Sequence, residues 1–392
     1  MASLSSIYLD HNATTPLAPE ALAAMLPYLG GYDAPFGNPS SIHAAGREAR
    51  AAVDDARDRL ARLLGARPHE IIFTGSGTEA DNLAVLGLAR NRARRGSERH
   101  LITSATEHHA VLHAAEFLEK HEAFRVTRLP VDGRGLVDPD ALRHAITPQA
   151  ALVSILSANN ETGTIQPVSE LAAICRGSGV PFHSDMVQSF GKTPVQANAG
   201  PDAISIAAHK FYGPKGVGAL WLRSGVSIDA IGLGGAQENE RRPGTENVAA
   251  IVGMVAAAEL AVKAIAEEQP RQAALRDRLW KGIEAAFPGA MRNGAWDEPA
   301  RQLANTLNVS FPGFDGATLL IHCDLAGLCV SSGSACMTGS PQPSHVLLAM
   351  GIPGEIAEAS LRFSLGKGTT EACIEAALVK LPSRMASPVR SG

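Results

Sequence analysis

One lysine stands where a lysine could do chemistry. Lys210 follows a short apolar run at 203–206, and the turn residues Gly213 and Pro214 come soon after it. A partly desolvated lysine at the end of a strand has a pKa below the ordinary value of about 10.4, and its neutral amine is a nucleophile that can form a Schiff base with a carbonyl group. Taken alone, Lys210 would also fit a solvated loop. The other polar residues at predicted strand ends are therefore needed to distinguish a reactive lysine from a surface lysine.

Polar residues follow four other predicted strands, each at the point where the strand ends. They are the segments 74–79, 106–108, 159–163 and 183–188, which follow apolar runs at 71–73, 101–103, 151–156 and 180–182. Ligands of an open parallel sheet bind at the carboxyl ends of its strands. The Gly/Ser/Thr segment 74–79 leads into a predicted helix, which suits a phosphate, but it is neither a P-loop nor GxGxxG, and this argues against ATP and NAD.

The remaining segments carry side chains that suit an aromatic cofactor. His108 could stack on a ring or move protons, Asn160 could bond an oxygen without adding charge, and Asp185 could pair with a protonated pyridine nitrogen. Each has a simpler interpretation: a hydrogen-bonded loop histidine, a turn asparagine and a helix cap. An aspartate at one strand end and Lys210 at the next are hard to explain by structure alone, and together they predict pyridoxal phosphate.

Repeated strand–helix units must position these residues. From 71 to 222, short apolar runs alternate with predicted helices, which predicts an α/β fold with a mostly parallel central sheet covered by helices. The pattern breaks at 268–270, and the residues beyond this point alternate less regularly, as expected of a smaller α+β C-terminal domain. We therefore predict a large cofactor-binding domain at 16–265 and a small domain formed by 1–15 and 266–392.

Composition limits the class of protein. The chain has 392 residues, 45% of them hydrophobic and 19% charged, and its net charge of −4 offers no basic surface to nucleic acid. We expect no signal peptide, and the longest apolar helix candidate, 248–265, contains Glu259 and Lys263, so we judge it too short and too polar to span a bilayer. Five cysteines without CxxC spacing predict free thiols in a reducing cytoplasm.

The order of these motifs resembles a known family. From about residue 8 to 381 the chain is similar to the class V, fold-type I pyridoxal phosphate-dependent transferases, and specifically to cysteine desulfurases of the nitrogen-fixation and iron–sulfur-assembly type. The segments that carry the resemblance are 8–15, 36–41, 77–79, 106–108, 159–163, Asp185 with Gln188, 209–210, 242–247, 331–336 and 362–364. Each is weak alone, and all of them in this order are specific.

The resemblance implies a role for each site residue. Lys210 would hold the cofactor as a Schiff base, Asp185 would pair with its pyridine nitrogen, and His108 would stack on the ring and move protons. The implied binding residues are Gln188 and Asn160 for the oxygen side of the ring, Gly77, Thr78 and His209 for the phosphate, Thr245 for the phosphate of the partner subunit in a homodimer, and Arg362 with Asn38 or Asn160 for the substrate carboxylate.

One position departs from the family pattern. The family usually has a serine two residues before His209, where it helps to hold the phosphate, and this chain has Ala207. The phosphate should lose one hydrogen bond, worth ~1 kcal/mol. We therefore expect weaker cofactor retention rather than loss of activity.

Cys336 lies among the small, flexible residues of 332–341, which predicts an exposed thiol on a mobile loop. An exposed thiol whose pKa is lowered by a neighbouring cation is a good nucleophile, whereas an incidental loop cysteine would be an oxidation liability. Cys323 and Cys329 lie in apolar runs, so we expect them to be buried and inert. Cys336 is thus the predicted sulfur acceptor.

The resulting hypothesis is the removal of sulfur from L-cysteine, which gives L-alanine and a persulfide on Cys336. The persulfide would pass to an iron–sulfur scaffold or another acceptor protein, with nitrogenase a candidate destination, and an iron–sulfur cluster could be bound through Cys336. Two alternatives stay open: a selenocysteine lyase or other class V enzyme, which need not use a loop thiol, and a non-catalytic sulfur carrier that has kept the fold.

Overall fold

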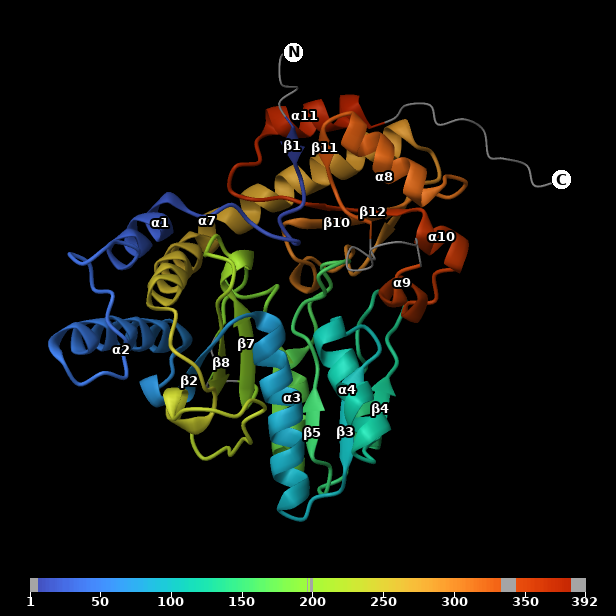
Figure 1. Cartoon of the computed structure of the whole chain (residues 1–392). Coiled ribbons are helices and arrows are strands. Elements are labelled where there is room, and N and C mark those ends of the chain that lie inside the picture. The colour runs from blue at the N-terminus through green and yellow to red at the C-terminus, as the bar shows by residue number, and fades with distance from the viewer. Residues whose placement is uncertain (1–5, 196, 198–199, 333–342, 382–392) are drawn as a thin grey trace.

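The computed structural model describes residues 6–195, 197, 200–332 and 343–381. Within them, a large sheet has seven strands in the order β2-β8-β7-β6-β5-β3-β4, and a small sheet has three in the order β12-β10-β9 (Figure 1). The strands of the large sheet are β2 (Ile71–Thr74), β3 (His100–Ser104), β4 (Arg125–Leu129), β5 (Leu152–Ser154), β6 (Phe182–Asp185), β7 (Ala203–Ala207) and β8 (Gly218–Leu222). The small sheet consists of β9 (Met291–Asn293), β10 (Thr306–Ser310) and β12 (Ser360–Ser364), while β1 (Ile7–Tyr8) pairs with β11 (Leu328–Cys329).

The large sheet is mostly parallel, as the alternating pattern predicts. Strands β4, β3, β5, β6 and β7 run parallel to one another, and β8 runs antiparallel to both β7 and β2. Every residue of β5, β6 and β7 is buried. Strands covered on both faces have this property, so the predicted fold class is confirmed.

Helices cover both faces of the large sheet. The helices of the described residues are α1 (Pro19–Met25), α2 (Ala44–Leu64), α3 (Gly77–Arg94), α4 (His109–His121), α5 (Pro139–Ala145), α6 (Val168–Ser178), α7 (Val248–Ala286), α8 (Gly316–Leu325), α9 (His345–Ala349), α10 (Gly354–Glu358) and α11 (Glu371–Lys380). Of these, α8 and α11 pack around the small sheet. Successive strand side chains point to opposite faces. Ile72 and Leu101 accordingly pack under α3 and α4, whereas Ile71 and Phe73 pack under α2 and α7.

A second core lies around the small sheet. Leu307, Val309 and Phe363 of β10 and β12 pack with Leu279 and Ile283 from the C-terminal half of α7. The N-terminal segment enters the same core through β1 and connects it to the large sheet. The small sheet with α7, α8 and α11 has the α+β character expected of the C-terminal part.

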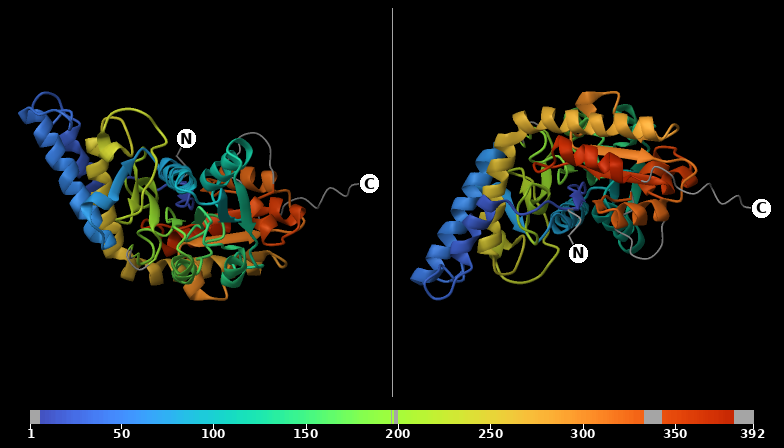
Figure 2. Two further views of the ribbon diagram at one scale, coloured as in Figure 1. Left: turned by 90° about the horizontal axis from the view of Figure 1, so that it is seen from below. Right: turned by 90° about the horizontal axis from the view of Figure 1, so that it is seen from above.

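Helix α7 corrects one prediction. It runs from Val248 to Ala286 through Pro270, where the sequence pattern predicts a break, and the predicted domain boundary at 265 therefore falls inside a helix. Figure 2 shows the helix changing direction along its length, as a proline that removes one backbone hydrogen bond allows. By length and composition α7 could cross a bilayer, contrary to our expectation, but 56% of its most apolar stretch is buried inside the protein.

Candidate active site

A cavity of about 390 Å³ lies at the carboxyl end of the large sheet. Its walls come from the ends of β5, β6 and β7, the first turns of α3 and α4, and the N-terminal segment 12–13. Small-molecule sites have volumes of ~300–1,000 Å³. The predicted site residues that line the cavity are Gly77, Thr78, His108, Asn160, Asp185, Gln188, His209, Lys210 and Arg362.

Lys210 lies directly after β7, in the short 3₁₀ helix Ala208–Lys210. Its Nζ donates hydrogen bonds to the main-chain oxygens of Asn12, at 2.6 Å, and Ala13, at 2.8 Å. These carbonyls belong to the N-terminal segment, which crosses from the small sheet to the end of β7. The amine is therefore held at the cavity wall, where a carbonyl compound can meet it.

Asp185 is the last residue of β6 and is 7% exposed. Its Oδ1 accepts a hydrogen bond from the main-chain N–H of Val187 at 2.8 Å. Burial raises the pKa of Asp185 to about 6, although the Val187 N–H and the charge of Lys210 lower it. A protonated ring nitrogen beside Asp185 would supply the positive charge that a buried carboxylate needs as a partner.

His108 is the N-cap of α4, and its Nδ1 accepts a hydrogen bond from the main-chain N–H of Ala110 at 3.1 Å. Burial, together with the charge of Lys210, lowers the pKa of His108 to about 4. The imidazole is therefore neutral at pH 7. Since Nδ1 is an acceptor, this network assigns the ring proton to Nε2.

The first turn of α3 forms a cradle for an anion. Ser76 caps the helix by accepting a hydrogen bond from Glu79 N at 3.0 Å, and Gly77 and Thr78, which begin the first turn, line the cavity. The first main-chain N–H groups of a helix have no partner within the helix and suit an anion. A Cβ on Gly77 would come within 2.9 Å of Val187 and 3.0 Å of Ala207. Glycine is thus required for this close approach, and the predicted phosphate position fits it.

Arg362 lies on β12 and brings the small sheet to the cavity. Its Nη2 donates to Asp10 Oδ1 at 2.8 Å, and its Nη1 donates to the main-chain oxygen of Asn160 at 3.1 Å. Its Nε has no hydrogen-bond partner among the described residues. A nearly buried guanidinium with donor capacity left over is suited to a carboxylate.

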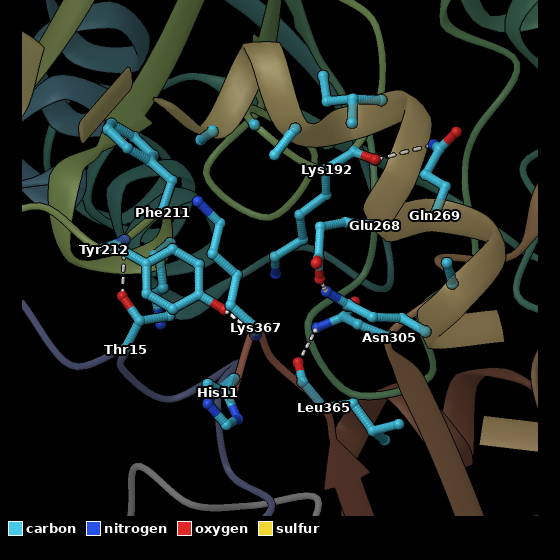
Figure 3. Close-up of a pocket in the computed structure, with 17 residues that line it drawn as sticks. His11, Thr15, Lys192, Phe211, Tyr212, Glu268, Gln269, Asn305, Leu365 and Lys367 are labelled. Carbon is cyan, nitrogen blue, oxygen red and sulfur yellow. Dashed lines mark hydrogen bonds between the residues drawn. The ribbon is translucent and has the colours of Figure 1, made fainter. Parts of the chain in front are cut away.

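Gln188 is oriented by a second lysine. Lys192 Nζ donates to Gln188 Oε1 at 2.8 Å and to Asn12 Oδ1 at 3.1 Å, and Gln188 Nε2 donates to the main-chain oxygen of Asn12 at 2.9 Å. Figure 3 shows Lys192, Asn305 and Lys367 around a second cavity, of about 40 Å³, which Lys210 also lines. This volume has room for ordered water.

Two of the predicted residues, Asn38 and Thr245, do not line the cavity of this chain. Asn38 is exposed, and its Oδ1 accepts from Ser40 N at 2.9 Å within its own turn. Thr245 is exposed in the segment before α7. Cys336 lies outside the described residues. Of the two cysteines expected to be buried and inert, Cys323 is buried, but Cys329, on β11 beside β1, is only partly buried.

Sequence reasoning missed three buried acids near the cavity. Asp81 and Glu161 line it, and Glu107, next to His108 in the chain, is buried with its Oε1 accepting from Ser104 Oγ at 2.7 Å. Burial raises the pKa of Glu107 to about 8 and that of Glu161 to about 7. Asp81 carried a signal, since it is a charged residue among the buried Ala80, Leu83 and Ala84 of one helix.

The residues present fit pyridoxal phosphate. A cavity of sufficient size joins an amine for the carbonyl, a glycine cradle at a helix N-terminus for the phosphate, and a buried carboxylate for the ring nitrogen. These features lie in the 3₁₀ helix after β7, in the first turn of α3 and at the end of β6, so the fold itself brings them together.

Comparisons with known proteins agree with this geometry. The family described as Aminotransferase class-V matches residues 7–376. A cysteine desulfurase IscS of Dictyoglomus turgidum is 48% identical over 366 residues, which cover 93% of this chain and 91% of the relative. Among solved structures, a NifS-like protein superposes with a TM-score of 0.88 at 37% identity over 96% of this chain and 98% of the other, and SspA in complex with cysteine superposes with a TM-score of 0.79 at 34% identity over 92% and 99%.

A family match of this length and relatives of this identity are sufficient to assign the family. The predicted resemblance and the predicted cofactor class are confirmed. The chain belongs to the cysteine desulfurases of the class-V aminotransferase family, which are enzymes dependent on pyridoxal phosphate.

Proposed function

We propose that this protein removes the sulfur of L-cysteine, giving L-alanine and a persulfide on Cys336. The observation that carries the proposal is the single cavity that Lys210, Asp185, His108 and Arg362 all line. The solved SspA structure contains cysteine, which is a property of that protein and supports the same substrate here.

The cofactor would be held at both of its ends. The main-chain N–H groups of Gly77 and Thr78, with His209, would bind the phosphate, and Asp185 would hold the ring nitrogen in its protonated form. When bound, pyridoxal phosphate supplies an electron sink for the bonds that change at the α-carbon of the substrate. Gln188, whose amide is oriented by Lys192, would donate from Nε2 on the oxygen side of the ring.

Arg362 would bind the substrate carboxylate. The Asp10 carboxylate and the Asn160 carbonyl hold two of its nitrogens, which fixes the plane of the guanidinium. An arginine held in this way binds a carboxylate in a defined orientation. The amino group and the sulfur of L-cysteine would then point in fixed directions within the cavity.

Two residues would move protons. The amine of Lys210 would take a proton from the α-carbon of the substrate, and His108, whose neutral ring carries its proton at Nε2, would exchange protons with the substrate. The Cys336 thiolate attacks the substrate sulfur, forming an S–S bond while the carbon–sulfur bond breaks. The sulfur atom moves from L-cysteine to Cys336, and the carbon that loses it is protonated to give L-alanine, so atoms and electrons balance.

Substitution of the two reactive residues tests the proposal. Cys336→Ala should keep the visible absorption band of the bound cofactor and release neither alanine nor sulfide from cysteine. Lys210→Ala should lose that band. Cys373→Ala is the matched control, since Cys373 is a free, partly buried thiol on α11, and it should turn over normally. Full turnover by Cys336→Ala with cysteine would refute the thiol's role, and turnover with selenocysteine alone would indicate a lyase.

We further propose a homodimer. Large apolar side chains are exposed on one side of the molecule, where Figure 2 shows α1 and α2: Leu26 is 58% exposed, Tyr32 94% and Ile42 91%. Several large, exposed apolar side chains within one stretch of the chain are typical of an interface. Thr245, which does not line the cavity of its own chain, would reach the phosphate of the partner subunit.

Mixed dimers test this arrangement. Lys210→Ala destroys the site of its own chain, and Thr245→Ala should weaken the site of the other chain. A dimer that contains one chain of each variant should regain one intact site, with cofactor retention and turnover about half those of the wild type. No recovery, or a mass of a single chain by light scattering, would refute the arrangement.

The acceptor and the location are also proposals. The segment after Cys336 and the pair Glu246-Asn247 resemble the nitrogen-fixation branch, so we propose an iron–sulfur scaffold as acceptor and nitrogenase as one destination. The free thiols Cys175, Cys323, Cys329 and Cys373 suit a reducing cytoplasm. Transfer of ³⁵S from labelled cysteine to a purified scaffold, lost in Cys336→Ala, is the expected result.

A further inference from the structure

Asp81 has no part in the proposed reaction, yet it lies in the wall of the same cavity. It stands on α3, about one turn after Gly77, and is 1% exposed. Its Oδ1 has no hydrogen-bond partner among the described residues. An ionised carboxylate in such a place would be costly, because no described residue replaces the water that Oδ1 has lost.

The groups that face Asp81 come from several elements. Asp185 and His183 lie on β6, Glu107 follows β3, and Ser205 lies on β7. Burial and the charge of Asp185 raise the pKa of Asp81 well above its usual range, the charge of Glu107 adds to this, and the Ser205 hydroxyl offsets only part of it. Its acidic neighbours therefore oppose a negative charge on Asp81.

His183 does not supply a compensating cation. Its Nε2 lies 3.7 Å from Asp81 Oδ1, which is too far for a hydrogen bond. Both ring nitrogens have other partners, Ser154 Oγ and Ser205 Oγ, each at 2.9 Å. Burial lowers the pKa of His183 to about 3, so the ring is neutral.

Asp185 is the better placed of the two aspartates to carry a charge. It accepts the Val187 N–H, and the charge of Lys210 favours its ionised form. Two carboxyl groups that share a dry site rarely ionise together. One proton should therefore remain on the pair, on the aspartate that has the poorer contacts.

We propose that Asp81 is held as a neutral carboxylic acid, and that it acts as a positioning residue that leaves Asp185 as the charged carboxylate at this end of the cavity. The protonated state of Asp81 depends only on this chain. The effect of Asp81 on the reaction rests on the proposed function, in which Asp185 presents a single negative charge to the ring nitrogen of the cofactor. Asp81 thus acts through Asp185 and need not touch cofactor or substrate.

Infrared spectroscopy of the cofactor-loaded protein at pH 7 tests the protonation. The difference spectrum between the wild type and Asp81→Asn should contain the carbonyl band of a protonated carboxylic acid. The Asp185→Asn variant should retain that band, and Asp81→Ser serves as a second reference if Asp81→Asn does not fold. A band lost in Asp185→Asn but kept in Asp81→Asn would place the proton on the other residue and overturn the proposal.

Stability against pH gives a second readout. A carboxyl group whose folded pKa is raised costs stability as pH rises from its unfolded pKa, about 3.9, toward the folded value. Asparagine resembles the neutral acid and does not titrate. The unfolding constant of the wild type relative to Asp81→Asn should therefore rise with pH between 5 and 8, by up to about tenfold per pH unit.

Glu70→Gln is the matched control, because its carboxylate has the opposite environment. Burial would raise the pKa of Glu70, but hydrogen bonds from Arg67, Ser224 and Trp221 outweigh it and lower the pKa to about 2. Its stabilising effect is complete above pH 5, so Glu70→Gln should be less stable than the wild type by a constant factor between pH 5 and 8. The same constant loss in Asp81→Asn would show an ionised, paired Asp81 and refute the proposal, whether or not the protein acts on cysteine.

Discussion

Buried carboxyl groups occur in two regions of the large sheet, and the two regions differ in how many hydrogen-bond donors these groups have. Beside β2 and β8, Glu238 accepts two hydrogen bonds of 2.7 Å from Arg57 and one of 3.1 Å from Phe73 N. Glu70, in the same region, accepts from main-chain and side-chain donors on both of its oxygens. At the cavity, Asp81 has an oxygen without a partner among the described residues, and Asp185 has the Val187 N–H.

The difference separates a region whose buried carboxylates stabilise the fold from a region whose polar groups can bind a ligand. A buried carboxylate with all of its donors in place stabilises the fold and has little capacity for another partner. Groups at the cavity are instead buried with part of their bonding capacity unused, and the cost is offset by packing elsewhere. A ligand that supplies a phosphate, a protonated ring nitrogen and a carboxylate would use that capacity.

The largest expected effect is a loss of stability when the buried Arg57–Glu238 pair is broken. Glu238→Gln leaves the Arg57 guanidinium buried without its charge partner, and we expect a loss of ~3–5 kcal/mol in the free energy of unfolding, measured by chemical denaturation. Asp54→Asn is the control, because the Arg50–Asp54 pair is half exposed and should cost less than ~0.5 kcal/mol. Equal losses in both variants would remove this half of the comparison.

The next effect concerns the substrate side of the cavity. Arg362→Lys keeps the charge but loses the planar, two-nitrogen contact, so we expect KM for L-cysteine to rise ~10- to 100-fold while the cofactor band stays unchanged. Arg278→Lys, at an exposed pair on α7, should leave KM as it is. An unchanged KM in Arg362→Lys would mean that the carboxylate binds elsewhere.

The phosphate cradle should respond to a single methyl group. Gly77→Ala would force a Cβ against Val187 and Ala207, and overpacking of this kind costs ~1–3 kcal/mol, so cofactor affinity should fall about tenfold by equilibrium titration. Gly177→Ala is the control, since a Cβ on this helical glycine would meet nothing within 4 Å. Unaltered affinity in Gly77→Ala would place the phosphate away from α3.

The smallest expected effect comes from a substitution that restores a missing hydrogen-bond donor. Ala207→Ser adds a hydroxyl at the end of β7, inside the cavity, and one hydrogen bond worth ~1 kcal/mol should tighten cofactor binding about fivefold. The rate of cofactor loss during dialysis against a carbonyl reagent is a suitable measurement. An unchanged rate of loss would show that the hydroxyl does not reach the phosphate.

Much of the site followed from local sequence. Lys210, Asp185 and His108 each stand at the end of an apolar run, and the parallel sheet brings such ends to one place. Helix α7 did not follow, because one proline in an apolar pattern suggests an end, whereas packing against two cores keeps the helix continuous through Pro270. Propensity is local, and tertiary packing can outweigh it.

The sequence by itself determined the order of strands and helices, the residues at the strand ends and the family. Only the tertiary structure decided which groups meet: the carbonyl of Asn12 on Lys210, the Asn160 carbonyl on Arg362, and Asp81 buried in the cavity wall without a donor for its Oδ1 among the described residues. These are contacts between segments far apart in the chain. Protonation states follow from them, because a pKa depends on burial and on charges that are near in space, not near in sequence.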